Sequence, residues 1–169
     1  MLLKLSFLLG CLIPSAAIAF YDYKDYRIPN KIVLFMAISG CLFVVATHNI
    51  LSGICGLLVF AGFHFIGWRL GVHGAGDVKF AAVLGLWFGL YPTLMVLILS
   101  SFAGAVWGLA AIIRAVGIGG LIRQIVSGAR SLIKPSQNNI PTLKYQVPLG
   151  ACMAAASWAV WLGILVFQL

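Results

Sequence analysis

The segment ILSGICGLLVFAGFHFIG, residues 50–67, carries no charged side chain. A helix needs about 20 mostly apolar residues to cross the roughly 30 Å hydrocarbon core of a bilayer, so this segment predicts a membrane-spanning helix. The rest of the chain agrees, because 63% of its 169 residues are hydrophobic and only 8% are charged. Too few polar groups are present to cover a water-soluble globule, which indicates an integral membrane protein.

Further apolar segments of similar length flank this one. The predicted spans cover residues 2–20, 31–48, 50–67, 79–97, 98–116 and 147–168. Because the connections are too short for a soluble domain, we expect an all-α polytopic membrane protein with about six transmembrane helices, in which residues 1–169 form a single domain. Glycine pairs at Gly67 and Gly71, at Gly85 and Gly89 and at Gly104 and Gly108 are expected to let helix backbones approach closely.

The distribution of charge predicts the orientation in the membrane. The chain has 11 Lys and Arg, 3 Asp and Glu and a formal net charge of +8, but its cations lie at the ends of apolar segments. We therefore expect no nucleic acid partner. If both termini lie outside the cytoplasm, Lys4 is the one cation on that side, as the positive-inside rule requires. Alternatively, residues 1–20 are typical of a secretory signal ending at Ala17-Ile18-Ala19, and its removal would leave five spans.

The segment 118–134 is amphipathic. Its apolar residues recur at helical spacing, while Arg123, Ser127, Arg130 and Lys134 occupy the other side. We predict a cytoplasmic helix here. It either lies on the inner leaflet against anionic membrane lipids or is a solvated loop helix without a lipid role.

The chain has three carboxylates, Asp22, Asp25 and Asp77, and no glutamate. Asp22 follows the first predicted span and Asp77 precedes the fourth, so the topology puts both at the cytoplasmic end of the bundle. Two carboxylates held close together share a proton, so that one activates water while the protonated one polarises a peptide carbonyl. This arrangement favours aspartyl proteolysis. In a purely structural reading, Asp77 would be the N-cap of the helix that follows, and Asp22 and Asp25 would pair with Lys24 or Arg27.

The segments around these aspartates resemble the two signature motifs of type IV prepilin peptidases. Asp22-Tyr-Lys-Asp-Tyr-Arg-Ile-Pro-Asn30 is similar to the family's D-x5-I-P-N, and Gly74-Ala-Gly-Asp-Val-Lys79 is similar to its G-x-G-D-x-K. Pro148-Leu149-Gly150 is similar to the Pro-Tyr/Phe-Gly found at the start of the family's last span. The resemblance implies that the catalytic pair is Asp22 and Asp77. Asp25 falls at a position that the motif leaves free.

The same resemblance implies an aspartic endopeptidase that removes the short basic leader of a type IV prepilin or pseudopilin. Cleavage would take place at the cytoplasmic face of the inner membrane and would serve pilus assembly or protein secretion. The small size resembles the minimal peptidases of Flp or Tad pilus systems, although archaeal preflagellin peptidases share the motifs. N-methyltransferase activity, which larger members carry together with a domain of paired cysteines, is not assigned. The precursor and the oligomeric state stay open.

Other residues of these motifs are candidates for shaping the site or binding substrate. Gly74 and Gly76 permit close approach of a substrate strand, and Pro29 suits the first turn of the second helix. Lys79 either tunes Asp77 or anchors the helix end near the headgroups. Asn30 and Pro148 complete this set.

Neither a metal nor another cofactor is expected. His73 lies four residues before Asp77 but has no further ligands at suitable spacing, and His48 and His64 are interpreted as structural. The four cysteines lie in apolar segments without a C-x-x-C pair, so no zinc ribbon or disulfide framework is predicted.

Two other functions remain open. A small proton-coupled transporter would relay protons through an acid pair at membrane depth, but it would predict inverted repeats, and no repeat is visible in the sequence. A non-enzymatic scaffold of a secretion system would depend on no carboxylate at all.

Overall fold

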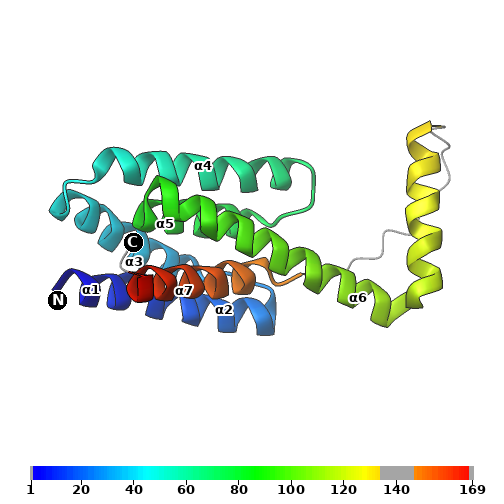
Figure 1. Cartoon of the computed structure of the whole chain (residues 1–169), viewed down its shortest axis with the longest axis horizontal. Coiled ribbons are helices and arrows are strands. Elements are labelled where there is room, and N and C mark those ends of the chain that lie inside the picture. The colour runs from blue at the N-terminus through cyan, green and yellow to red at the C-terminus, as the bar shows by residue number, and fades with distance from the viewer. Residues whose placement is uncertain (1, 134–146, 168–169) are drawn as a thin grey trace. The chain divides into compact units, whose positions relative to one another are not determined.

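The computed structural model describes residues 2–133 and 147–167, and these residues form helices joined by short connections (Figure 1). The elements are α1 (Leu2–Phe7), a π-helical turn η1 (Leu8–Leu12), α2 (Ile13–Asp25), α3 (Asn30–Ala46), α4 (Ile50–Arg69), α5 (Ala75–Phe88), α6 (Leu90–Ile133) and α7 (Leu149–Phe167). The predicted all-α class is confirmed.

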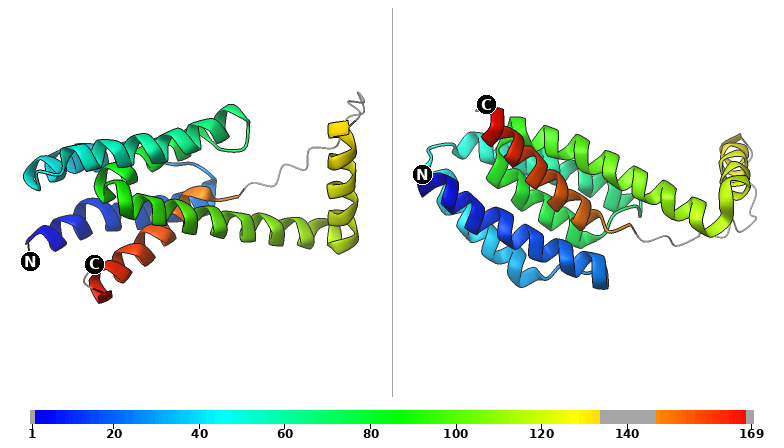
Figure 2. Two further views of the ribbon diagram at one scale, coloured as in Figure 1. Left: turned by 45° about the horizontal axis from the view of Figure 1, so that its top comes forward. Right: turned by 60° about the horizontal axis from the view of Figure 1, so that its bottom comes forward.

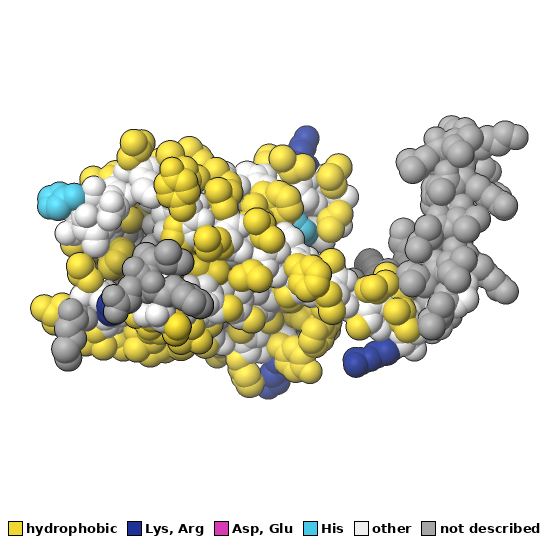
Figure 3. Space-filling view, in the orientation of Figure 1, with side chains coloured by type: hydrophobic (Ala, Val, Ile, Leu, Met, Phe, Trp, Pro, Cys, Tyr) yellow, Lys and Arg dark blue, Asp and Glu magenta, His cyan; other side chains and the backbone are white. Residues whose placement is uncertain are grey.

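Four helical segments are long and apolar enough to cross a membrane: Leu2–Asp25, Ile50–Arg69, Leu90–Ala115 and Leu149–Val166. Large apolar side chains on α4, including Leu51, Leu58 and Ile66, are exposed, and apolar side chains cover much of the face in Figure 3. The protein is therefore an integral membrane protein. With 17 and 14 residues, α3 and α5 are about 26 Å and 21 Å long, shorter than a bilayer core, so the count of six spans stays a prediction.

The boundary between the predicted spans 79–97 and 98–116 is wrong. The chain ends α5 at Phe88 and turns at Gly89, whose φ of 70° lies in the left-handed region that favours glycine. A Cβ at Gly89 would also lie 2.6 Å from the Ser52 hydroxyl oxygen, and Leu90 donates its N–H to that oxygen at 3.1 Å. Hydropathy does not reveal this turn because apolar residues continue on both sides of it.

The described chain divides into two compact units, of which the first comprises Met1–Phe102 and Pro148–Leu169. In this unit the helices run side by side; α1, η1 and α2 continue in one direction, and from α2 onward successive helices alternate in direction (Figures 1 and 2). The ends of α2 and α4 therefore lie at the same end of the unit as the starts of α3, α5 and α7.

Trp87 of α5 contacts three other elements of the first unit, which are α1, η1 and α3. A Cβ at Gly10 would lie 2.5 Å from the indole Cη2, and a Cβ at Gly40 would lie 2.8 Å from the indole Nε1. The Nε1–H donates to the Met36 carbonyl at 2.9 Å, and the Phe7 ring stacks edge-on at 5.4 Å. The two glycines make room for the ring, which fixes α5 against η1 and α3.

Glycines also bring α4 and α5 together. A Cβ at Gly85 would overlap the Gly56 carbonyl, and a Cβ at Gly56 would overlap the Gly85 carbonyl, so the two backbones touch. The close approach predicted for Gly85 and Gly89 is confirmed. The same prediction for Gly67 and Gly71 is wrong, because Gly67 makes room for the His73 ring and Gly71, with a φ of 75°, ends α4.

The second unit comprises Ala103–Val147. Within it, α6 is interrupted at Gly117, where φ is 71° and ψ is 172°, and the helix then continues to Ile133. A helix over 118–133 is therefore present, while Lys134 lies outside the described residues. Its amphipathic character and its place on a cytoplasmic leaflet stay predictions.

Candidate active site

The two sequence motifs meet at the end of the first unit where α2 stops and α3, α5 and α7 begin. Lys79 Nζ of α5 donates a hydrogen bond to Asn30 Oδ1 at the start of α3, at 3.3 Å. A Cβ at Gly76 would lie 3.2 Å from the Cβ of Ile28. The segment 22–30 therefore contacts the segment 74–79 both through a polar bond and through apolar packing.

Asp22 lies in the last turn of α2 and is only 5% exposed. Its Oδ2 accepts the N–H of Ala151, the third residue of α7, at 3.1 Å. The free N–H groups and the positive potential of a helix start stabilise a carboxylate there. A Cβ at Gly150 would lie 3.0 Å from the same oxygen, so glycine at this position leaves room for the carboxylate. The buried Pro148 directly precedes the helix.

Asp77 lies in the first turn of α5, three residues after the N-cap, which is Gly74. The prediction that Asp77 itself is the N-cap is therefore wrong. Its Oδ2 instead accepts the Gly74 N–H at 2.9 Å, as the acidic residue of a capping box does. The carboxylate thus contributes to capping while it lies beside the residues of the first motif.

Electrostatics connects the two aspartates. Burial raises the pKa of Asp77 from 3.8 to about 6, the Gly74 N–H lowers it, and the negative charge of Asp22 raises it further. The last effect requires the two carboxylates to be close enough to repel each other. Such a pair resists the ionisation of both carboxylates, which keeps a proton on it up to about pH 6.

The loop that leads into Asp77 is held in place by the end of α4. The Gly71 N–H donates to the Trp68 carbonyl at 3.0 Å and the Val72 N–H to the Gly67 carbonyl at 2.9 Å, which is the Schellman pattern of a helix C-terminus. The His73 ring then covers Gly67 and lies 4.9 Å from the ring of His64. This packing restrains the residues directly before Gly74.

The two histidines fit a structural role. His64 is buried and its Nδ1 lies 3.1 Å from the Phe60 carbonyl. Burial lowers the pKa of His73 and a hydrogen bond to the His64 backbone raises it, so the ring is largely neutral near pH 7. Within the described residues, no group of three or more His, Cys, Asp or Glu side chains could hold a metal ion.

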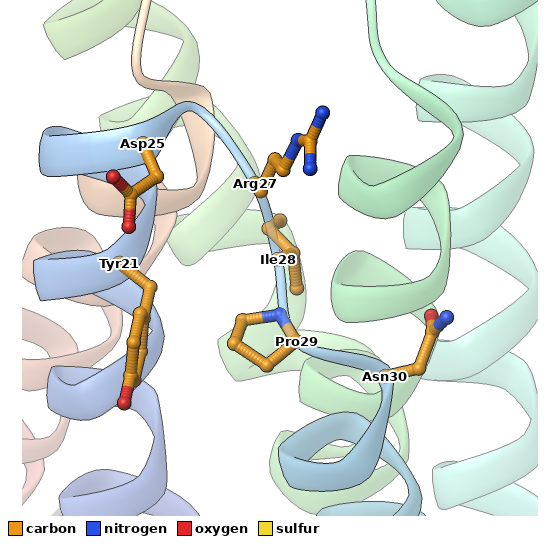
Figure 4. A pocket seen from close by; sticks show the side chains of 6 residues that line it. All are labelled: Tyr21, Asp25, Arg27, Ile28, Pro29 and Asn30. Carbon is orange, nitrogen blue, oxygen red and sulfur yellow. The ribbon is translucent and has the colours of Figure 1, made fainter.

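An open cavity of about 600 Å³ adjoins the site at the connection between α2 and α3. It is lined by Tyr21, Asp25, Arg27, Ile28, Pro29 and Asn30 (Figure 4). The predicted alternative pairing is not seen, since no ion pair joins Asp22 or Asp25 to Lys24 or Arg27 in the described part of the chain. Pro29 is the N-cap of α3 and so lies just before the first turn rather than within it.

Sequence reasoning missed three contributors to this arrangement. Ile28 lies between Gly76 and Gly150, within 3.2 Å and 3.1 Å of the positions that their Cβ atoms would occupy. Both Ile28 and Gly150 lie inside the motifs. In the sequence, however, neither the apolar side chain of isoleucine nor the absence of a side chain in glycine indicates a role in the site. The Ala151 N–H could not be found from sequence, since every non-proline residue has a backbone N–H.

Comparison with known proteins gives one match. The sequence profile described as the type IV leader peptidase family matches residues 7–109, a range that includes both aspartates and their motifs. No curated protein and no solved structure matches the chain. The matched range is more than half of the 169 residues, and the helical membrane-spanning fold agrees with a membrane peptidase. The chain belongs to the type IV leader peptidase family.

Proposed function

We propose that the protein is an aspartyl endopeptidase in which Asp22 and Asp77 form the catalytic pair. Family membership implies an aspartic-type peptidase that acts on prepilins in general. One observation supports the choice of residues above all others: two carboxylates from α2 and α5 lie close enough for the charge of Asp22 to raise the pKa of Asp77. A shared proton is what this reaction needs.

The reaction uses that proton in two steps. The ionised carboxylate takes a proton from a water molecule, whose oxygen attacks the carbonyl carbon of the scissile peptide bond, while the protonated carboxyl donates to the carbonyl oxygen. The tetrahedral intermediate then carries two hydroxyl groups; as it collapses and the C–N bond breaks, one hydroxyl returns its proton to the ionised carboxylate and the leaving nitrogen takes the proton of the protonated carboxyl. The pair ends with one shared proton again, so no cofactor is required.

The proposed substrate is a prepilin or pseudopilin of the Flp/Tad type, and the proposed place of cleavage is the cytoplasmic face of the inner membrane. Five cations lie at the same end of the first unit as the two aspartates: Lys24, Arg27, Lys31, Arg69 and Lys79. Under the positive-inside rule this end faces the cytoplasm, and both termini lie outside it. Exposed Tyr21, Tyr23 and Tyr26 near the end of α2 suit a membrane–water interface.

Co-expression with a candidate Flp-type prepilin tests the proposal. Wild-type protein is expected to convert the precursor to a form shorter by its leader, seen as a shift on a gel and as a new N-terminus by mass spectrometry. A variant carrying both Asp22→Asn and Asp77→Asn is expected to leave the precursor intact at equal membrane abundance. Cleavage by this double variant would contradict the aspartyl mechanism.

A further inference from the structure

The open cavity beside α2 contains one carboxylate, that of Asp25. Figure 4 shows Asp25 and Tyr21 extending from the same helix, while Ile28, Pro29 and Asn30 come from the chain that continues into α3. The cavity of about 600 Å³ has the size of a typical ligand site and is larger than one amino-acid side chain. A segment of peptide therefore fits it better than a single small group.

The carboxylate of Asp25 is available to an external cation. Asp25 is exposed and has no ion pair in the part of the chain that the structure describes. Arg27 also lines the cavity, but its guanidinium is turned away from Asp25 in Figure 4. Asp22 is buried and Asp77 half-buried, so Asp25 is the exposed carboxylate at this end of the first unit and the place where a cationic ligand is attracted.

The position of Asp25 connects this cavity to the candidate catalytic pair. Residues three apart in a helix lie on neighbouring parts of one face, about 5–6 Å apart at Cβ, and Asp25 is three residues after Asp22 in α2. A cation bound to Asp25 would therefore belong to a substrate residue near the cleaved bond. The Tyr21 ring in the same wall can add a cation–π contact.

We propose that this cavity is a subsite for a Lys or Arg side chain of the peptide being cleaved, with Asp25 as its ion-pair partner. Asp25 then determines specificity and takes no part in the chemistry. The inference rests on the peptidase function proposed above, and it gives Asp25 a role that the family motif does not.

Kinetics with purified protein in detergent and a purified prepilin test this inference. Asp25→Asn is expected to raise KM about tenfold, as for one charge-assisted hydrogen bond in a partly solvated site, with little change in kcat. Changing the matching Lys or Arg of the prepilin to Gln should raise KM for wild type as much as Asp25→Asn does. The same change in the prepilin should not raise KM further for the Asp25→Asn variant. Added salt should raise KM for wild type more than for Asp25→Asn.

A charge exchange identifies the pair. A prepilin with that Lys or Arg changed to Glu should be a poor substrate for wild type and should regain processing with Asp25→Lys. Lys4→Gln is the matched control, because it removes an exposed charge at the opposite end of the first unit, away from the cavity lining, and should leave KM unchanged.

The outcomes separate this inference from the function on which it rests. If wild type cleaves the prepilin and Asp25→Asn has the same KM, or if Asp25→Asn lowers kcat instead, the subsite does not exist as described and the peptidase function still stands. If wild type cleaves no prepilin under any condition, the proposed function is wrong, and the proposed subsite is then wrong as well.

Discussion

At the scale of single residues, Asp22 and Asp77 each combine a structural and a proposed chemical role, and the amide of Asn separates the two. Asn at either position can still accept the backbone hydrogen bond from Ala151 or Gly74, so the fold should be kept. Neither amide can accept a proton, so each single change should lower prepilin cleavage by at least about a hundredfold. The measurement is the fraction of co-expressed prepilin processed per amount of variant in the membrane.

Ser15→Ala serves as the control for this prediction. Ser15 is buried on α2 as Asp22 is, and its hydroxyl donates to the Leu12 carbonyl at 2.7 Å, away from the two motifs. Its loss should leave cleavage intact. Substantial processing by a well-expressed Asp77→Asn or Asp22→Asn variant would show that helix capping is the whole role of that carboxylate.

The raised pKa of Asp77 predicts a dependence of stability on pH. The folded state holds the proton more tightly than the unfolded chain, with a pKa of about 6 against 3.8. The stabilising contribution is therefore complete below pH 3.8 and is lost as pH rises through about 6. Thermal unfolding in detergent at pH 4 to 7 should show wild type losing stability relative to Asp77→Asn over this interval.

The Asp22→Asn variant tests one contribution to that shift, which is smaller than the contribution of burial. Because the charge of Asp22 contributes to raising the pKa of Asp77, its removal should move the midpoint of the pH dependence below about 6. An unchanged midpoint would mean that the two carboxylates do not interact. Unfolding curves of wild type and Asp77→Asn that stay parallel with pH would mean that Asp77 has an ordinary pKa.

Much of the candidate site could be anticipated from sequence because the residues proposed for the chemistry are of types that are rare in this chain. Aspartates are rare in this chain, so Asp22 and Asp77 stand out, and Asn30 and Lys79 stand in the same motifs. Ile28 and Gly150 could not be assigned a role, since their contribution is shape. It becomes visible only when the contacts to Gly76 and Asp22 are known.

At the scale of elements, the sequence predicted α3, α4 and α7 to within two residues at each end. The first span continues to Asp25, beyond the predicted end at 20, because Asp22 finds a hydrogen-bond donor on α7 and its burial is compensated. The turn at Gly89 was missed because it lies within one continuous apolar run. Apolar length predicts that a helix crosses a membrane, but it does not show where the chain turns back.

The start of α7 yields a prediction for Gly150. Gly150→Ala would place a methyl group 3.0 Å from Asp22 Oδ2 and 3.1 Å from Ile28 Cδ1, so the carboxylate has to move by a few tenths of an ångström. Catalysis is sensitive to such displacement, and a shift of about 1 Å can cost about a hundredfold, so cleavage should fall about tenfold or more. The readout is kcat for prepilin processing, together with the temperature of unfolding.

Gly163→Ala is the matched control because it makes the same change in the same helix, with nothing within 4 Å of the new methyl group. This variant should keep full activity and be as stable as wild type or more so, since alanine favours a helix interior over glycine. Equal activity of the Gly150 and Gly163 variants would show that the Asp22 carboxylate does not need the space at the start of α7.

At the scale of the whole molecule, the charges of the first unit are unevenly distributed between its two ends. Lys4 stands at the start of α1, whereas Lys24, Arg27, Lys31, Arg69 and Lys79 stand at the opposite end of the first unit together with all three aspartates. The same end of the unit therefore carries both the cations that predict the orientation and the aspartates proposed for the chemistry. A test of orientation is for this reason also a test of where cleavage takes place.

Single cysteines in a cysteine-free variant provide that test, after Cys11, Cys41, Cys55 and Cys152 are replaced. Asn49→Cys lies in the connection between α3 and α4, and Val72→Cys lies in the connection between α4 and α5, at opposite ends of α4; both positions are exposed. Because the cations should face the cytoplasm, a membrane-impermeant thiol reagent applied to intact cells should label Asn49→Cys and leave Val72→Cys unlabelled until the cells are opened. The permeabilised sample controls for reactivity, since both cysteines should then react. Labelling of Val72→Cys alone in intact cells would invert the topology and place Asp22 and Asp77 on the face away from a cytoplasmic leader.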